Sequence, residues 1–311
     1  MTQLVLQDGT VFDGEAFGAK IDTDGEVVFT TGMVGYPESM TDPSFRGQIL
    51  VFTYPLIGNY GVPSEELNEH GFSKNFESEN IHVRGVIVAQ ASDFYSHHAA
   101  VSSFGNWMEH HKIPGITGVD TRMLTKKLRE HGVMLGRIVQ DNAAAKSSKR
   151  EAASAIADPN LRNLVAEVSC TEVHTYESKP ETRNQDVKSH VGDHVPFTGK
   201  PVTVLAYDCG MKRNIIRSFL KRGVRVVRVP WDFDLYSYTD PYDGVFISNG
   251  PGDPKMCQPT IKGIRRAIEK NIPTFGICLG NQLMALAIGG DTYKLQYGHR
   301  QKAAQQIELK N

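Results

Sequence analysis

The second half of the sequence alternates between short apolar runs and longer segments with helical spacing. Apolar runs separated by helical segments are the pattern of a parallel sheet whose strands are connected through helices. The predicted strands are 202–207, 224–229, 243–248 and 273–277. The predicted helices are 212–222, 260–270 and 281–288. This alternation predicts an α/β fold with a doubly wound parallel sheet from residue 201 onward.

The first part of the chain, up to about residue 140, has a different pattern and is predicted to be rich in β-structure. Leu4–Leu6 and Val11–Phe12 flank Asp8-Gly9, a turn signal that predicts a hairpin. Further predicted strands are 26–29, 48–54 and 83–89. Helices are predicted at 101–111 and 121–131, the second with Asp120 as its N-cap.

The boundaries follow from these changes of pattern. A length of 311 residues suggests two domains, since a domain usually holds about 100–200 residues. We expect a β-rich N-terminal domain over 1–150, a connector over 151–200 and a parallel-sheet domain over 201–311. The end of the connector, 178–200, is polar and contains two prolines and two glycines, which is typical of a linker.

One cysteine lies where a predicted strand runs directly into a predicted helix. Gly276 and Gly280 flank Cys278 at the spacing of a nucleophile elbow. Small neighbours permit a strained turn, and the start of a helix favours a thiolate and can hold an oxyanion. The alternative is a buried structural cysteine, because free cysteines are among the most buried residues. The local pattern leaves both interpretations open.

A second candidate segment, Ser248–Pro254, follows an earlier predicted strand. Ligands bind at this end of the strands in open α/β sheets, and Gly250 and Gly252 would let backbone amides approach a substrate. A plain glycine- and proline-containing loop is the alternative. The segment lacks the third glycine of a dinucleotide fingerprint, and no phosphate-binding loop motif occurs in the sequence.

Composition excludes several classes of protein. The net charge of −1 argues against broad nucleic-acid binding. Four cysteines without C-x-x-C spacing argue against a disulfide scaffold or a structural zinc site, so no metal site is expected. The longest apolar run is far shorter than a bilayer-spanning helix, and the N-terminus lacks a targeting pattern. We therefore expect a cytoplasmic protein that binds neither membrane nor nucleic acid.

Taken together, GICLGNQ (276–282) and SNGPGDP (248–254) resemble a class I glutamine amidotransferase. Three further segments, 25–61, 118–132 and 208–217, resemble the small, glutamine-hydrolysing chain of carbamoyl-phosphate synthetase. The similarity is greatest to the form at the N-terminus of the animal multifunctional pyrimidine-synthesis enzyme. It implies a small-chain N-terminal domain followed by an amidotransferase domain, and a role in pyrimidine or arginine biosynthesis.

The resemblance also implies a mechanism. Cys278 would attack the side-chain amide of L-glutamine, release ammonia and form a glutamyl thioester. The amides of Leu279 and Gly252 would hold the oxyanion, and Gln282, Gly250 and Ser44 would bind glutamine. Ammonia would pass to a large synthetase subunit or a fused synthetase domain. That partner would bind ATP and magnesium, so no cofactor is expected in this chain.

The general base of the family is not found in the sequence. The family takes its histidine and glutamate from a His-Pro-Glu segment, and no His-x-Glu occurs in the 311 residues. His299 matches a position upstream of that histidine and is a weak candidate to replace it. We therefore expect a truncated amidotransferase domain with little glutaminase turnover of its own. The alternatives are a fragment of an active enzyme and an inactive chain that retains only a docking surface for its partner.

Overall fold

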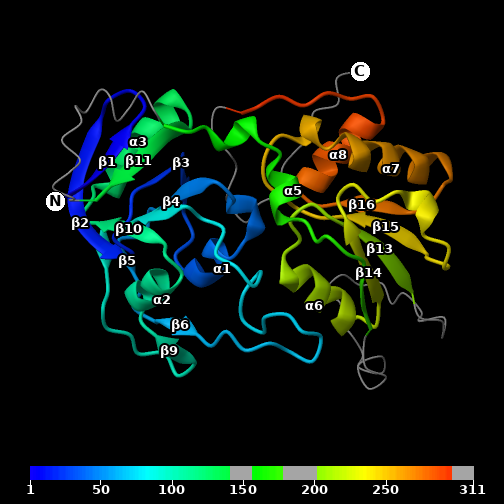
Figure 1. Ribbon diagram of the computed structural model, residues 1–311, viewed down its shortest axis with the longest axis horizontal. Helices are drawn as coiled ribbons and strands as arrows, with labels where there is room; N and C mark the ends of the chain where they lie inside the picture. Colours follow the sequence, from blue (N-terminus) through cyan, green and yellow to red (C-terminus); the bar gives the residue numbers. More distant parts are fainter. Residues whose placement is uncertain (141–155, 178–201, 296–311) are drawn as a thin grey trace, which may run out of the picture. The chain divides into compact units, whose positions relative to one another are not determined.

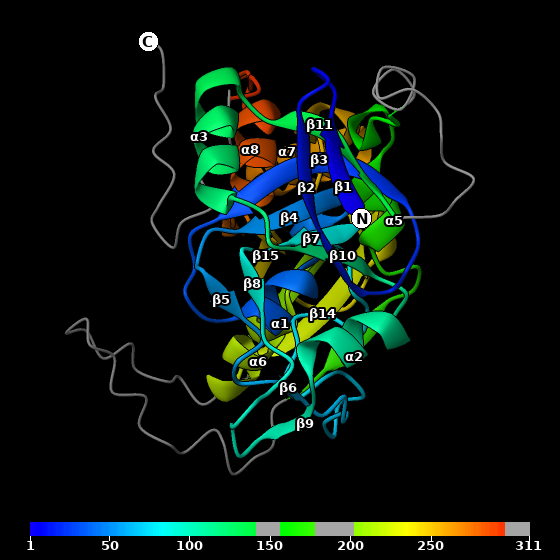
Figure 2. The same ribbon diagram turned by 90° about the vertical axis from the view of Figure 1, so that its left-hand side faces the viewer.

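A closed barrel of strands forms the centre of the first part of the chain in the computed structural model, which describes residues 1–140, 156–177 and 202–295 (Figure 1, Figure 2). Its strand order is β1-β11-β3-β4-β7-β10-β2. The bounds are β1 Thr2–Leu6, β2 Val11–Gly18, β3 Thr23–Thr30, β4 Gln48–Phe52, β7 Gly85–Ile87, β10 Pro114–Thr117 and β11 Met134–Val139. The predicted hairpin is confirmed, since β1 and β2 pair antiparallel. Barrel closure is an additional finding, because apart from this hairpin the sequence predicted strands but not their pairing.

Two apolar clusters pack on opposite faces of the barrel strands. Alternate residues of a strand point to opposite faces. Val27 and Ile49 belong to a cluster with α3 (Thr121–His131), whereas Val28 and Leu50 belong to a cluster with α1 (Tyr36–Met40) and α2 (Phe104–His110). The barrel is therefore covered by helices as well as filled by side chains.

The helix α3 follows the prediction residue for residue. The Asp120 side chain accepts a hydrogen bond from the Met123 amide at 2.8 Å, which confirms the N-cap. The predicted helix over 101–111 begins later, at Phe104, because Ser103 caps it. The preceding residues form β9 (Ala100–Ser102), which pairs with β6 (Val62–Pro63). Short pieces complete this part: η1 Pro43–Phe45, β5 Leu56–Ile57, β8 Gln90–Ala91 and η2 Pro159–Leu161.

A five-stranded sheet with the order β12-β14-β13-β15-β16 forms the later part of the chain. The bounds are β12 His174–Tyr176, β13 Thr203–Asp208, β14 Arg225–Pro230, β15 Gly244–Ile247 and β16 Thr274–Gly276. The pairs from β14 to β16 are parallel, as the sequence predicted. The pairing of β12 with β14 is antiparallel, so the sheet is mixed at this edge.

Helices cover both faces of this sheet (Figure 1). The bounds are α5 Leu164–Val168, α6 Arg213–Lys221, α7 Gln258–Glu269 and α8 Leu279–Ala287, with η4 Leu235–Ser237 and η5 Pro254–Met256 between them. The Phe219 ring of α6 contacts Phe246 of β15 on one face. Ile247 of the same strand belongs to the cluster that contains Ile264 of α7 and Leu283 of α8. This is the doubly wound arrangement that the alternation predicted.

The described residues divide into two compact units. The first holds residues up to Arg162 together with 293–295, and the second holds those from Asn163 to Thr292. Part of the segment predicted as connector contributes α5 and β12 to the second unit. This occurs because Leu164 and Val165 are buried and His174–Tyr176 pairs with β14. The predicted linker over 178–200 lies outside the described residues.

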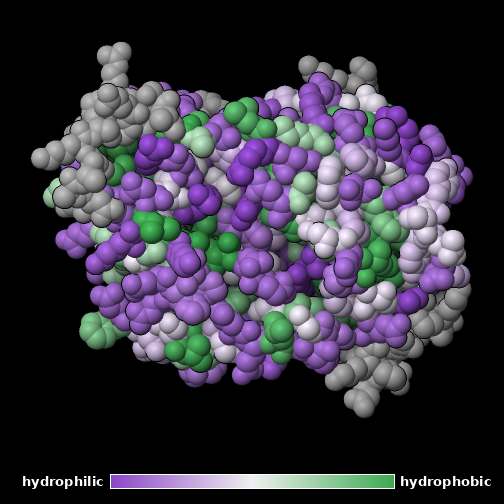
Figure 3. Space-filling view, viewed as in Figure 1, coloured by the Kyte–Doolittle hydropathy of each residue, from purple (hydrophilic) through white to green (hydrophobic). Residues whose placement is uncertain are grey.

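The exterior has a mixed character. On the face shown in Figure 3, hydrophobic residues form separate small patches among hydrophilic ones. Scattered apolar side chains of this kind are ordinary on protein surfaces. Among the residues described, no helix combines the length and the apolar character that crossing a bilayer requires.

Candidate active site

The backbone of Cys278 has an unusual conformation between β16 and α8. Its φ is 54° and its ψ is −110°, outside the regions that side-chain-bearing residues favour. The Cys278 carbonyl accepts the amides of Asn281 at 3.0 Å and Gln282 at 3.2 Å, which starts the helix. Strained backbone of this kind is found most often at functional sites.

The two flanking glycines are required by close packing. A Cβ atom at Gly276 would lie 2.4 Å from the backbone of Gly280. A Cβ at Gly280 would lie 2.3 Å from the carbonyl oxygen of Ile247, at the end of β15. The turn therefore has the geometry of a nucleophile elbow, as the spacing predicted.

The environment of Cys278 also differs from that of the other cysteines. Cys278 is exposed, whereas Cys209 and Cys257 are buried and Cys170 is partly buried. Burial raises the pKa of Cys257 to about 12 and that of Cys170 to about 12, with Asp208 adding to the second shift. Burial also raises the pKa of the Cys209 thiol. Because a thiol must ionise and be reached to act as a nucleophile, Cys278 is the cysteine suited to this chemistry.

The loop after β15 lies against the start of α8. A Cβ at Gly250 would lie 2.8 Å from Cδ2 of Leu279 and 1.9 Å from the carbonyl oxygen of Cys209. Gly252 has a φ of +80° and faces Leu164 of α5. Within the described ranges, no backbone acceptor takes up the amide of Leu279 or of Gly252. The structure thus brings Gly250 next to Leu279. Gly252 lies in the same loop as Gly250, and Cys278 directly precedes Leu279.

The remaining predicted site residues do not all lie in the segments around Cys278 and Gly250. Gln282 lies in the first turn of α8. Ser44 lies in η1 of the first unit, half-buried, with its amide donating to Asp42 Oδ1 at 2.9 Å. Because Ser44 and Cys278 belong to different units, a shared role in binding glutamine stays a prediction. His299 lies outside the described residues.

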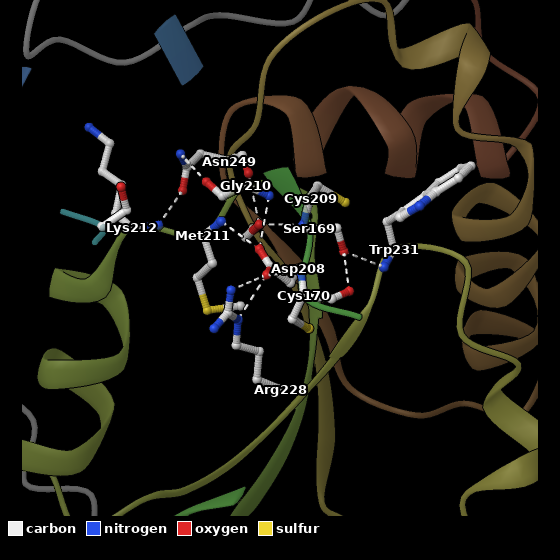
Figure 4. Close-up of polar contacts among 12 residues, drawn as sticks. Ser169, Cys170, Asp208, Cys209, Gly210, Met211, Lys212, Arg228, Trp231 and Asn249 are labelled. Atoms are coloured by element: carbon white, nitrogen blue, oxygen red, sulfur yellow. Dashed lines mark hydrogen bonds and ion pairs between the residues drawn. The ribbon is translucent and has the colours of Figure 1, made fainter. Parts of the chain in front are cut away.

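The sequence reasoning missed a buried polar network behind the loop. Asp208, at the end of β13, is fully buried and forms an ion pair with Arg228 of β14 (Figure 4). Asn249 joins the loop to the same network, because its Nδ2 donates to the carbonyl of Gly210 at 2.9 Å. A signal was present in the sequence, since Asp208 directly follows an apolar strand.

The residues described contain no group of His, Cys, Asp or Glu side chains arranged to hold a metal ion. The described residues of this site offer three kinds of group. These are an exposed thiol on a strained turn, backbone amides at the start of a helix, and a glycine-containing loop beside them.

Comparison with protein families identifies two regions. Residues 4–138 match the carbamoyl-phosphate synthase small chain, CPSase domain. Residues 205–311 match the glutamine amidotransferase class-I family.

Individual relatives match almost the whole chain. The multifunctional protein CAD of Squalus acanthias is 48% identical over 302 residues, which is 96% of this chain and 12% of that protein. The multifunctional protein URA2 of Saccharomyces cerevisiae is 46% identical, over 96% of this chain and 14% of its own length. The arginine-specific carbamoyl phosphate synthase small chain of Aspergillus fumigatus is 46% identical, over 95% of this chain and 60% of its own length. The chain thus spans less than two thirds of each of these relatives.

Proposed function

We propose that this chain, which belongs to the carbamoyl-phosphate synthase small-chain family with its class-I glutamine amidotransferase domain, uses Cys278 to take ammonia from glutamine. The observation that carries the proposal is the exposed Cys278 thiol on a strained turn at the start of α8. The match to the glutamine amidotransferase class-I family supports glutamine as the substrate.

The proposed reaction is an acyl transfer. Cys278 Sγ attacks the carbon of the glutamine side-chain amide, and the carbonyl oxygen becomes an oxyanion. The amides of Leu279 and Gly252 would stabilise that oxyanion, while Gly250 and Gln282 would contact the substrate. Breaking the C–N bond releases ammonia, with the thiol proton going to the leaving nitrogen. Water then converts the glutamyl thioester to glutamate and restores the thiol.

The fate of ammonia is part of the same proposal. It would be used by a large synthetase chain, or a fused synthetase domain, to make carbamoyl phosphate from bicarbonate and ATP. The relatives support this partner, since one is an arginine-specific small chain and two others are multifunctional proteins. ATP and magnesium would bind to the partner. A cytoplasmic location stays a prediction.

The test uses a reagent that combines glutamine-like binding with alkylation. A chloromethyl ketone analogue of glutamine would react when Cys278 Sγ displaces chloride and forms a thioether. We expect Cys278 to be labelled with saturation kinetics and to be protected by glutamine. Iodoacetamide, which carries no glutamine-like group, should react without saturation.

The Cys278→Ala variant is the control, and intact-mass measurement reads the labelling. Labelling that does not saturate, or that glutamine does not slow, would contradict the proposal. Glutamate release from glutamine, measured on the same protein, reports turnover separately. Saturable labelling without turnover would support binding and a reactive thiol, and the glutamyl thioester should then accumulate because water does not remove it.

A further inference from the structure

The carboxylate of Asp208 is the centre of the polar network in Figure 4. Its Oδ1 accepts the amides of Gly210 at 2.9 Å and Met211 at 2.7 Å. Its Oδ2 accepts the amide of Cys170 at 2.8 Å and Nε of Arg228 at 2.8 Å, and Arg228 Nη2 donates to it as well. A single side chain therefore fixes the backbone that follows β13.

Asp208 is held in its charged form. The Asp208 side chain has no exposed surface, and that of Arg228 is 8% exposed. Burial by itself would raise the pKa of the Asp208 carboxyl, but Arg228 and the amides of Met211 and Gly210 bring that pKa below its ordinary value. A buried carboxylate needs such partners, because an unpaired buried charge is strongly destabilising.

The backbone that Asp208 holds is in direct contact with the glycine loop after β15. The Cys209 amide donates to Ser248 Oγ at 2.9 Å, and the Gly210 carbonyl accepts Asn249 Nδ2 at 2.9 Å. A Cβ on Gly250 would lie 1.9 Å from the Cys209 carbonyl oxygen, so these two segments of the backbone are packed too closely to admit a side chain at Gly250. A shift of 209–211 must therefore move 248–250.

That loop is in turn packed against the residue after the nucleophile, since a Cβ on Gly250 would lie 2.8 Å from Leu279 Cδ2. We propose that Asp208, paired with Arg228, is a positioning residue that sets where Gly250 and Gly252 lie relative to the start of α8. The inference rests on the proposed function, because it assigns Asp208 to the placement of the glutamine and oxyanion groups.

The substitution Asp208→Asn tests this with little change of shape. If its Nδ2 took the place of Oδ1, it would face the amides of Gly210 and Met211, and if it took the place of Oδ2, it would face the amide of Cys170 and the Arg228 guanidinium. In either orientation an N–H group meets donors that the carboxylate now accepts, so the network that holds this backbone would be disturbed. The matched control is Asp243→Asn. Asp243 Oδ2 accepts the amide of Thr203 at 2.8 Å, at the opposite end of the same strand. In the parallel pair of β13 and β15, that end lies beside the start of β15, whereas the glycine loop follows the end of β15.

We expect Asp208→Asn to raise the glutamine chloroketone concentration for half-maximal inactivation about tenfold, because a misplacement of about 1 Å costs up to about 100-fold and the expected shift is smaller. Its iodoacetamide rate should stay within about twofold, since thiol exposure is unchanged. Asp243→Asn should match the wild type with both reagents. The thermal unfolding of each variant is measured as well, to show that the variant is folded.

The chloroketone and iodoacetamide together distinguish a positioning role of Asp208 from a purely structural one. Chloroketone inactivation of Asp208→Asn equal to wild type, or an equal loss of both reactivities, would overturn the inference alone. Wild-type labelling without saturation or glutamine protection would overturn the proposed function and the inference with it. If Asp208→Asn does not fold, Arg228→Lys takes its place. Lysine keeps the positive charge but cannot make the two-pronged contact of arginine. We expect this variant to raise the chloroketone concentration for half-maximal inactivation several-fold. An unchanged concentration would overturn the inference.

Discussion

At the scale of single residues, the backbone of Cys278 has a conformation that is unfavourable for a residue with a side chain. Its φ of 54° and ψ of −110° are conformations that glycine adopts and that side chains resist. The sequence predicted this turn because Gly276 and Gly280 flank the cysteine at a recognisable spacing. It could not predict Asp208 as a partner of the loop, because that contact depends on how β13, β14 and β15 lie together.

Replacement of Cys278 by glycine should stabilise the second unit while removing the thiol. Relief of the strained conformation is worth about 1 kcal/mol, since such residues cost about 1–3 kcal/mol and glycine loses more backbone freedom on folding. Cys278→Ala is the control, because it removes the thiol but keeps a Cβ. Urea unfolding measures the difference, and a glycine variant no more stable than the alanine variant would contradict the strain.

Gly250 should not tolerate a side chain. A Cβ there would overlap the Cys209 carbonyl, and overpacking of this kind costs about 1–3 kcal/mol. We expect Gly250→Ala to lower the free energy of unfolding by that amount and to slow glutamine-directed labelling of Cys278. Gly105→Ala is the control, since a Cβ at Gly105 of α2 meets nothing within 4 Å. Equal stability of the two variants, measured by urea unfolding, would show that the predicted overlap does not exist.

Elements with strong local signals were predictable, and those defined by long-range pairing were not. Helix α3 follows from Asp120 and its apolar spacing, and the alternation after residue 201 predicts β13 to α8. The closed barrel and the antiparallel β12 depend on which strands pair, and no short-range pattern determines that choice. The Asp208–Arg228 pair belongs to the second group, because it joins the neighbouring strands β13 and β14.

This pair should give the second unit a pH-dependent stability. The pKa of Asp208 is lower in the folded chain than its ordinary value of 3.8, despite burial, because Arg228 and backbone amides favour the carboxylate. Its contribution is therefore fully present above about pH 4 and is lost as the pH falls through the lower folded pKa. We expect urea unfolding between about pH 5 and pH 3 to show a smaller loss of stability in Asp208→Asn than in the wild type. Equal losses in the two proteins would mean that Asp208 is not linked to folding.

At the scale of the whole molecule, the chain combines two folds with separate cores. One is a closed barrel with its covering helices, and the other is a doubly wound sheet that carries Cys278. Its two family matches fall on these two parts, over 4–138 and 205–311. The sequence predicted that Cys278 and the glycine loop follow strands, as they do after β16 and β15, while their roles in catalysis stay predictions. The place of Ser44 in the site stays a prediction, because Ser44 and Cys278 belong to different units. His299, the weak candidate for the base, lies outside the described residues.

The central claim is that Cys278 forms an acyl intermediate with glutamine. The direct measurement is the intact mass of the protein after mixing with excess glutamine and quenching with acid, which preserves thioesters. We predict an added mass equal to glutamine minus ammonia, located on Cys278 and absent from Cys278→Ala. Unmodified wild-type protein at every mixing time together with no glutamate release, or the same added mass on Cys278→Ala, would contradict the account.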